Sequence, residues 1–576
     1  MTAGRHRWFA AVLSAGVVLR ALAMIGYRPA LWFPDSYTYV VTAMRPRPDL
    51  VRPAGYSMFL RLLEPFHSFG VVALVQHVLG LATGVLVYAA ARRLHAPDRV
   101  PSGQVASGGV RSGGVDSGRV GSGRGGSGWT GSGWTGSGFV GALAAAPVLL
   151  DAYQVELEHL LVSDTLFMFL VVAAVYVAMG PLTWRTACVT GLLLATATLT
   201  RTVGLPLIAV VAGWLLVHHL LAARRLRPAP AEGPDLAEVP PGSASAEGPG
   251  LAEVRPGSAA SGGVARRVRL VGVLVVVALV PIAGYAAWFS SAHHRFGIVG
   301  SNGVFLYART MAFADCGVLR PPPDLAVLCD PTPPARRPPS QEYVWAAGSP
   351  LVALPGITFT ARTDRLAGRF ALLALRGQPV DYAASVLSEL ARSFAWGRPV
   401  YPDQQIYDHY EFPAAPPPPP DRDPATAGAE FAVRYERGPI GTRITEPFAG
   451  WTRAYQDVAR LPGTVLLALL LAPPVVAAAR RRTTHRTAAR LAARTDAGAR
   501  TDADPSARTG AGAEGSWVLP WVMALSLLVI PAATAEFDYR YVLPAVPLAC
   551  LAAALMTSRQ ADQSETALPA KSVNFQ

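Results

Sequence analysis

Carboxylates and arginines stand at the ends of apolar runs in several distant parts of this sequence. Asp35 lies in WFPDSYTYVV (32–41), directly after the first apolar run, and Arg52 and Tyr56 follow in VRPAGYSMFLRLL (51–63). A carboxylate can take a proton from an incoming hydroxyl group. An arginine can hold a phosphate through paired charge-assisted hydrogen bonds. Together these residue types suit a transfer reaction on a phosphorylated substrate.

Three further apolar boundaries carry the same residue types. The members outside the first loop are Glu156, Glu158, His159 and Asp164 in YQVELEHLLVSDTLF, Arg201 in LTRTVGLPL, and Glu536, Asp538, Arg540 and Tyr541 in AEFDYRYVLPAVPL. Each residue has a structural alternative: Asp35 as a helix cap, Arg201 as a snorkelling side chain, His159 as a surface histidine. The group argues for function, because ionisable residues at membrane depth are costly and tend to be functional.

Composition predicts a multi-pass membrane protein. The 576 residues are 51% hydrophobic and only 15% charged, whereas soluble domains carry about 25% charged residues. The net charge of +13 comes almost entirely from arginines in loops beside apolar runs, which argues against a nucleic-acid partner. The four cysteines exclude a disulfide-rich scaffold. The first apolar run lacks a small-residue cleavage signature, so we expect a retained anchor.

The apolar runs predict an all-α protein with about ten transmembrane helices, since each approaches the length that crosses about 30 Å of hydrocarbon. The runs are 8–27, 70–91, 139–155, 161–179, 186–200, 203–221, 270–290, 462–479, 517–535 and 540–557. Arginine clusters near residues 5–7, 92–99, 224–227, 266–269 and 480–482 then fall on one side, which is the cytoplasmic side by the positive-inside rule. Both termini are predicted to be cytoplasmic, and the loop with Asp35 to be outside.

This assignment divides the chain into membrane segments and loops. The predicted segments are 1–91 (spans one and two with the first outer loop), 92–138 (a disordered Gly/Ser-rich cytoplasmic loop), 139–221 (spans three to six), 222–268 (a second disordered cytoplasmic loop), 269–290 (span seven), 291–461 (an outer-face segment), 462–479 (span eight), 480–516 (an Arg/Ala-rich cytoplasmic loop), 517–557 (spans nine and ten) and 558–576 (a cytoplasmic tail). The loops contain low-complexity sequence that cannot bury enough apolar surface to fold.

The outer-face segment has two local features of its own. Cys316 and Cys329 flank a Pro-rich turn in FADCGVLRPPPDLAVLCD, and on the oxidising side of a membrane they are expected to form a disulfide. The stretch 378–396 has a proline at its second position and helical apolar spacing. It predicts a helix lying near the outer membrane surface.

The motifs PDSYTY, RPAGYSMFLRLL, EHLLVSDTLF, TRTVGLPL and RYVLPAVPL resemble polyprenyl-phosphate-dependent glycosyltransferases of the GT-C fold. That group includes protein O-mannosyltransferases and lipid A aminoarabinose transferases. The resemblance covers about half of the chain and implies sugar transfer from a polyprenyl phosphate to an acceptor on the outer face of the cytoplasmic membrane. The acceptor would be an envelope glycan, lipid or protein, and the Arg/Ala/Gly-rich composition fits a bacterium.

The resemblance also implies roles for individual residues. Asp35 matches the catalytic aspartate of the first loop, as general base or as the group that orients the acceptor hydroxyl. The residues expected to bind substrate are Arg52, Tyr56, Glu158, His159, Asp164, Arg201, Arg540 and Tyr541, with the arginines on the lipid phosphate. No cofactor is expected with certainty; the single acid at position 35, where an acidic pair would hold a metal, leaves a divalent metal ion open. A secondary transporter and a non-catalytic envelope assembly protein are the alternatives.

Overall fold

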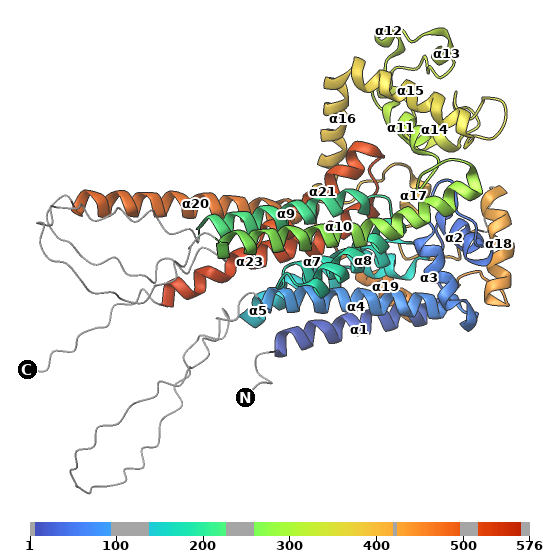
Figure 1. The fold of residues 1–576 in the computed structure, drawn as a ribbon. Helices are drawn as coiled ribbons and strands as arrows, with labels where there is room; N and C mark the ends of the chain where they lie inside the picture. Colours follow the sequence, from blue (N-terminus) through green and yellow to red (C-terminus); the bar gives the residue numbers. More distant parts are fainter. Residues whose placement is uncertain (1–5, 94–136, 226–257, 419–422, 496–515, 566–576) are drawn as a thin grey trace, which may run out of the picture.

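The computed structural model describes residues 6–93, 137–225, 258–418, 423–495 and 516–565 (Figure 1). These residues are mostly helical, as the sequence predicts. Their one sheet pairs β1 (Tyr27–Arg28) with β2 (Arg443–Ile444) in antiparallel register. The described part of the chain is therefore an all-α structure in which a two-residue ribbon ties the end of the first helix to the outer segment.

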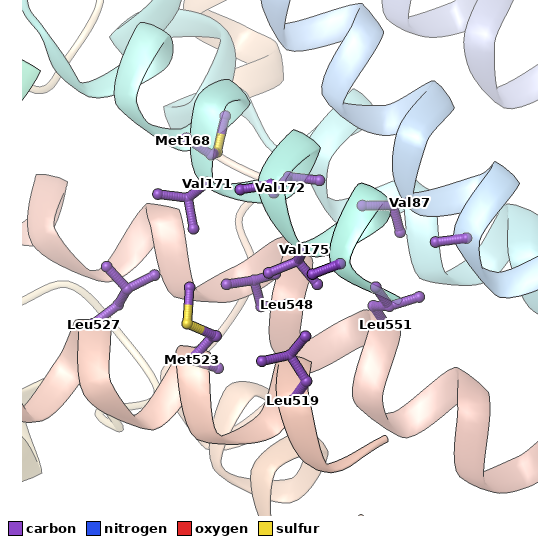
Figure 2. Packing of buried hydrophobic residues seen from close by; sticks show 14 of the residues in the cluster. Val87, Met168, Val171, Val172, Val175, Leu519, Met523, Leu527, Leu548 and Leu551 are labelled. Carbon is purple, nitrogen blue, oxygen red and sulfur yellow. The ribbon is translucent and has the colours of Figure 1, made fainter. Parts of the chain in front are cut away.

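The long helices run side by side in one bundle (Figure 1). They are α1 (Arg7–Gly26), α4 (Phe69–Arg93), α5 (Ser137–Leu150), α7 (Asp164–Ala178), α8 (Trp184–Thr200), α9 (Gly204–Arg225), α10 (Ser258–His293), α20 (Gly463–Thr495), α21 (Val518–Thr534) and α23 (Val546–Glu565). Figure 2 shows the centre of the bundle, where Val171 and Val175 of α7 meet Met523 of α21 and Leu548 of α23. Close packing of branched side chains holds these helices together.

The structure supports fewer spans than the ten predicted. Within the described residues, five helices are long and apolar enough to cross a membrane: α1, α4, α10 from Val264, α20 as far as Thr483, and Tyr539–Met556. The run at 139–155 is broken: α5 and α6 (Ala152–His159) meet at a bend of 50°, and would add a sixth span if counted together. Asp151 caps α6 by accepting the Gln154 N–H at 3.0 Å, which fixes the break. The apolar stretches 164–178, 204–220 and 518–534 are shorter than the roughly 20 residues that a span needs.

The predicted loops fall largely on residues outside the described part of the chain. Where the structure describes their edges, helix replaces predicted loop. Helix α10 begins at Ser258, α20 continues to Thr495, and α23 continues to Glu565. The Arg- and Ala-rich composition of residues 478–495 favours this extension, because both residues are strong helix formers.

Short helices gather at one end of the bundle (Figure 1). They are α2 (Pro34–Met44), α3 (Gly55–Leu63), α11 (Asn302–Thr310), α12 (Cys316–Leu319), α13 (Pro323–Ala326), α14 (Glu342–Trp345), α15 (Ala361–Gly377), α16 (Pro379–Arg392), α17 (Gln404–Asp408), α18 (Asp423–Glu436), α19 (Phe448–Gln456) and α22 (Tyr539–Val542). The start of α1 and the end of α23 lie at the opposite end. The first loop and the 291–461 segment therefore share one end, as the alternation of spans requires.

The outer segment contains its own apolar core. Helix α11 packs against α15, and Val304, Tyr307 and Phe370 are fully buried between them. The predicted disulfide is confirmed: Cys316 and Cys329 are bonded, with their Cα atoms 6.1 Å apart. The bond closes the turn at the edge of this small core.

Candidate active site at the end of the bundle

Asp35 lies at the start of α2, in the loop between α1 and α4. Pro34 opens this helix, and the Ser36 side chain accepts the Phe33 N–H at 3.0 Å, so the carboxylate stands in the first helical turn. Arg52 donates to one carboxylate oxygen, and Arg540 Nη1 donates to the other at 3.1 Å. The side chain is 14% exposed. Two arginines from opposite ends of the sequence thus meet on one carboxylate.

The surroundings keep Asp35 ionised. Burial would raise the pKa of its carboxyl, but the charges and hydrogen bonds of Arg52 and Arg540 outweigh burial and lower that pKa below its ordinary value. The carboxylate is therefore an anion at any physiological pH while both arginines remain in place.

Arg540 also binds a second aspartate. Its Nε donates to Asp538 Oδ2 at 2.9 Å, and the backbone N–H of Arg540 donates to Asp538 Oδ1 at 3.2 Å, which makes Asp538 the cap of α22. The Arg540 guanidinium lies 4.4 Å from the Phe33 ring centre and 5.4 Å from that of Tyr541. The turn between α21 and α23 thereby presents a fixed guanidinium to the first loop.

Arg201 joins the same group from α8. It ends that helix and pairs with Asp164, the first residue of α7. Its guanidinium lies 4.9 Å from the Tyr541 ring centre, on the ring that Arg540 also contacts. We call Asp35, Arg52, Asp164, Arg201, Asp538, Arg540 and Tyr541 the Asp35 cluster. All seven were singled out in the sequence, and four distant segments supply them.

Tyr39 connects the Asp35 cluster to a fully buried layer. Its hydroxyl donates to Ser163 Oγ at 3.2 Å, and its ring lies 5.9 Å from the Arg52 guanidinium and edge-on to Tyr56 at 4.8 Å. Tyr56 is completely buried and donates to Gln76 Oε1 at 2.6 Å. The sequence suggested that Tyr56 binds substrate; the structure instead places it behind Tyr39, where it supports the wall of the site.

Glu158 and His159 belong to a separate buried network. Arg20 donates to both oxygens of Glu158 at 2.7 Å, and His77 bridges Glu158 and His159 with contacts of 3.0 Å on each side. His159 Nε2 donates to the Tyr27 carbonyl oxygen at 2.6 Å. None of these four side chains is more than 3% exposed. The structure thus places Glu158 and His159 in a closed network away from the Asp35 cluster, where each buried ionisable group is held by partners, and their contact with substrate stays a prediction.

The sequence interpretation missed the partners of this network. Gln76 and His77 lie inside the apolar run 70–91, for which the sequence predicts only a transmembrane helix. Two adjacent polar residues in the middle of such a run were the available signal, since polar groups inside a membrane helix demand partners.

No metal centre accompanies the aspartates. Across the residues the structure describes, no group of three or more His, Cys, Asp or Glu side chains could hold a metal ion. Each aspartate of the Asp35 cluster faces an arginine instead. The divalent metal left open by the sequence finds no fitting donor set in this part of the molecule.

A small apolar depression borders the Asp35 cluster. It is shallow and open to solvent, and is lined by Ser393, Leu527, Leu528, Pro531, Ala532, Phe537, Asp538, Tyr541 and Val542. Asp538 and Tyr541 belong to the Asp35 cluster, whereas Leu527, Leu528, Pro531 and Ala532 come from the apolar helix α21. The site thus combines a charged head region with an apolar side.

Comparisons with known proteins assign no family to the chain. No family model matches the sequence, and neither a curated protein nor a solved structure matches it.

Proposed function

We propose that the protein is a membrane glycosyltransferase that moves a sugar from a polyprenyl phosphate to an acceptor on the outer face of the cytoplasmic membrane, with the GT-C-like arrangement that its motifs resemble. The observation that carries the proposal is the convergence of Asp35, Arg52, Arg201 and Arg540 at one end of the bundle. These are the groups that a lipid phosphate and an attacking hydroxyl require.

The charge balance of the Asp35 cluster suggests how substrate and carboxylate are coupled. Three arginines are matched by three aspartates, so the cluster is formally neutral before substrate arrives. A phosphate competes with Asp35 for Arg52 and Arg540, since guanidinium groups bind both anions in the same bidentate manner. Donor binding then releases the Asp35 carboxylate toward the acceptor hydroxyl.

Release also changes the basicity of Asp35. With Arg52 and Arg540 turned to the phosphate, the influences that lower its pKa are weakened and burial raises it. The freed carboxylate accepts the proton of the acceptor hydroxyl as the oxygen attacks the anomeric carbon. The arginines meanwhile stabilise the charge that develops on the leaving phosphate. One set of ion pairs thus serves both halves of the reaction.

The apolar surroundings suit the remainder of the donor. The depression beside Asp538 and Tyr541 is walled by α21 residues such as Leu527 and Leu528. We propose that only the first part of the polyprenyl chain meets this depression, while the phosphate reaches Arg540.

The arrangement favours this function over a secondary transporter. A transporter would carry open ionisable sites near the bilayer midplane. The ionisable residue in the interior of α1 is Arg20, and Glu158 together with the backbone carbonyls of Gly16, Val148 and Leu149 accepts its hydrogen bonds. A side chain whose donors are occupied in this way stabilises the fold and is not an open site for a transported substrate.

Binding of a matched lipid pair tests the proposal. Purified protein in nanodiscs is titrated with a short polyprenyl phosphate and, as control, with the corresponding polyprenol, which has the same chain without the phosphate. We expect the phosphate to bind at least tenfold more tightly, and its advantage to shrink at high salt. Equal binding of the two lipids would remove the proposal.

A further inference from the structure

Helix α16 presents one apolar face without a protein partner. Its exposed positions include Val380, Ala383, Ala384, Leu387 and Ala391, which recur at helical spacing on a single stripe. Val380 is 77% exposed and Leu387 is 65% exposed. We call these five residues the α16 stripe. An exposed polar flank lies beside it on the same helix, formed by Asp381, Ser388 and Arg392.

The opposite face of α16 is fastened to the end of α21. Tyr382 donates to the Ala533 carbonyl oxygen at 3.0 Å. Glu389, 8% exposed, accepts the Phe537 N–H at 3.0 Å and the Tyr401 hydroxyl at 3.2 Å. Phe537 precedes Asp538, so α16 holds the turn that carries the Asp538–Arg540 part of the Asp35 cluster.

The position of α16 indicates what covers its stripe. The helix crosses the direction of α20 and α21 (Figure 1). The residues just after it lie beside the start of α20, where the Gly463 N–H donates to the Ala395 carbonyl oxygen at 2.9 Å. Helix α20 is a candidate span that exposes Leu471 and Val475 along its length. The α16 stripe therefore lies near the end of α20 from which the exposed apolar surface of that helix extends.

The neighbouring side chains fit a lipid surface. Trp396, 73% exposed, stands just after α16, at a depth where tryptophans gather at membrane interfaces. The apolar stripe beside a charged flank is the pattern of a helix that lies in the interface plane.

We propose that α16 lies on the lipid surface at this end of the bundle, with the α16 stripe against the acyl chains and the Asp381–Arg392 flank in the headgroup layer. Through Glu389 the lipid-supported helix fixes the position of the turn that carries Arg540. The inference depends on the membrane setting and not on the reaction, so it stands or falls apart from the proposed glycosyl transfer.

Site-directed spin labelling in nanodiscs of phosphatidylethanolamine and phosphatidylglycerol tests the proposal. Cys188 and Cys550 are replaced by serine, and single cysteines are introduced in two neighbouring pairs: Val380→Cys with Asp381→Cys, and Leu387→Cys with Ser388→Cys. All four positions are exposed, so the labels fit without disturbing the core. Power saturation then compares collisions with lipid-soluble oxygen and with a water-soluble nickel chelate.

The expected result is an alternation within each pair. Labels at 380 and 387 collide at least severalfold more with oxygen than with nickel, while labels at 381 and 388 show the reverse preference. Equal nickel access within both pairs would place α16 in water and overturn the proposal. Exclusion of both reagents at 380 and 387 would equally overturn it, because a second copy or another protein would then cover the stripe.

Discussion

At the scale of single residues, the Asp35 cluster is a set of ion pairs that a substrate must rearrange. Asp35 is shared by Arg52 and Arg540, while Arg201 is held by Asp164, whose side chain is 1% exposed. Removing one partner of a buried pair leaves the other uncompensated and destabilises the fold. Replacing Arg201 alone would therefore strand the buried Asp164 carboxylate and mix loss of stability with loss of binding.

Arg201 is expected to contribute to donor binding rather than to stability alone. The double variant Asp164→Asn/Arg201→Gln removes the pair without leaving a buried charge, and should weaken binding of a polyprenyl phosphate roughly tenfold to a hundredfold, as loss of a charge-assisted hydrogen bond implies. Asp164→Asn is the matched control and should retain or improve affinity, because it frees the guanidinium. Equal affinity of the double variant and the control, measured by titration in nanodiscs, would make Arg201 purely structural.

At the scale of elements, α16 and the turn after α21 meet at two carboxylates. The Tyr401 hydroxyl lies 3.1 Å from Glu536 Oε1 and 3.2 Å from Glu389 Oε1. The Tyr401 hydroxyl lies within donating distance of both carboxylates, so two buried acids share one donor. Consistent with this, burial, aided by the charge of Glu389, raises the pKa of Glu536 to about 7, against the hydrogen bonds from the Ser340 and Gln341 backbone and Tyr401.

This contact predicts a pH-dependent stability. Because the folded-state pKa of Glu536 is about 7 and its ordinary value is 4.5, the folded protein binds more protons than the unfolded chain between these values. The contribution of Glu536 to stability should therefore fall as pH rises from about 5 to about 7 and level off above. Thermal unfolding of the wild type and of Glu536→Gln across this window checks it. The variant should have the flatter curve, and parallel curves would assign the dependence to other groups.

The disulfide should stabilise the outer segment. It closes a loop with a sequence separation of 13, for which loss of unfolded-state entropy predicts about 3 kcal/mol. The variant Cys316→Ser/Cys329→Ser should lower the midpoint of thermal unfolding measured under non-reducing conditions, whereas Cys188→Ser, which removes a free thiol, should leave it unchanged. Similar midpoints for both variants would mean that the turn is already rigid without the bond.

The arrangement of the helices explains which parts of the site could be predicted from the sequence and which could not. Asp35, Arg201 and Arg540 were brought together correctly, because alternation of apolar runs puts their loops at one end whatever the packing. The burial of Glu158 and His159 could not be predicted, because it follows from the bend of α6 after Asp151, and no periodicity in an eight-residue stretch reveals its direction. The pairing of Arg20 with Glu158 depends on packing between α1 and α6, which a single sequence does not encode locally.

At the scale of the whole molecule, the long helices form a bundle with the Asp35 cluster and the outer segment at one end (Figure 1). Among the residues that the structure describes, five helices are long and apolar enough to span a membrane. The apolar stretches of α7, α9 and α21 are shorter, and these helices pack within the same bundle. The arginine pattern still predicts that the end with the cluster faces outward.

Labelling with a membrane-impermeant maleimide tests that orientation. Ser388→Cys, beside the α16 stripe, should react in intact cells, whereas Thr483→Cys, at the other end on α20, should react only after the membrane is permeabilised. Both residues are exposed, so access and not burial decides the outcome. Reaction of Thr483→Cys alone in intact cells would reverse the topology and, with it, the side on which transfer takes place.

The catalytic use of Asp35 is the central claim, and one assay tests it most directly. Wild-type protein and Asp35→Asn are reconstituted into liposomes with polyprenyl phosphates that carry a radiolabelled hexose or pentose, together with an envelope extract as the source of acceptor. The asparagine keeps the shape of the side chain but cannot accept a proton. We predict that the wild type transfers label and that the variant, expressed at normal levels, does so about 10²–10⁴-fold more slowly, while it still binds the donor through Arg52, Arg201 and Arg540. Transfer by Asp35→Asn at the wild-type rate would contradict the account.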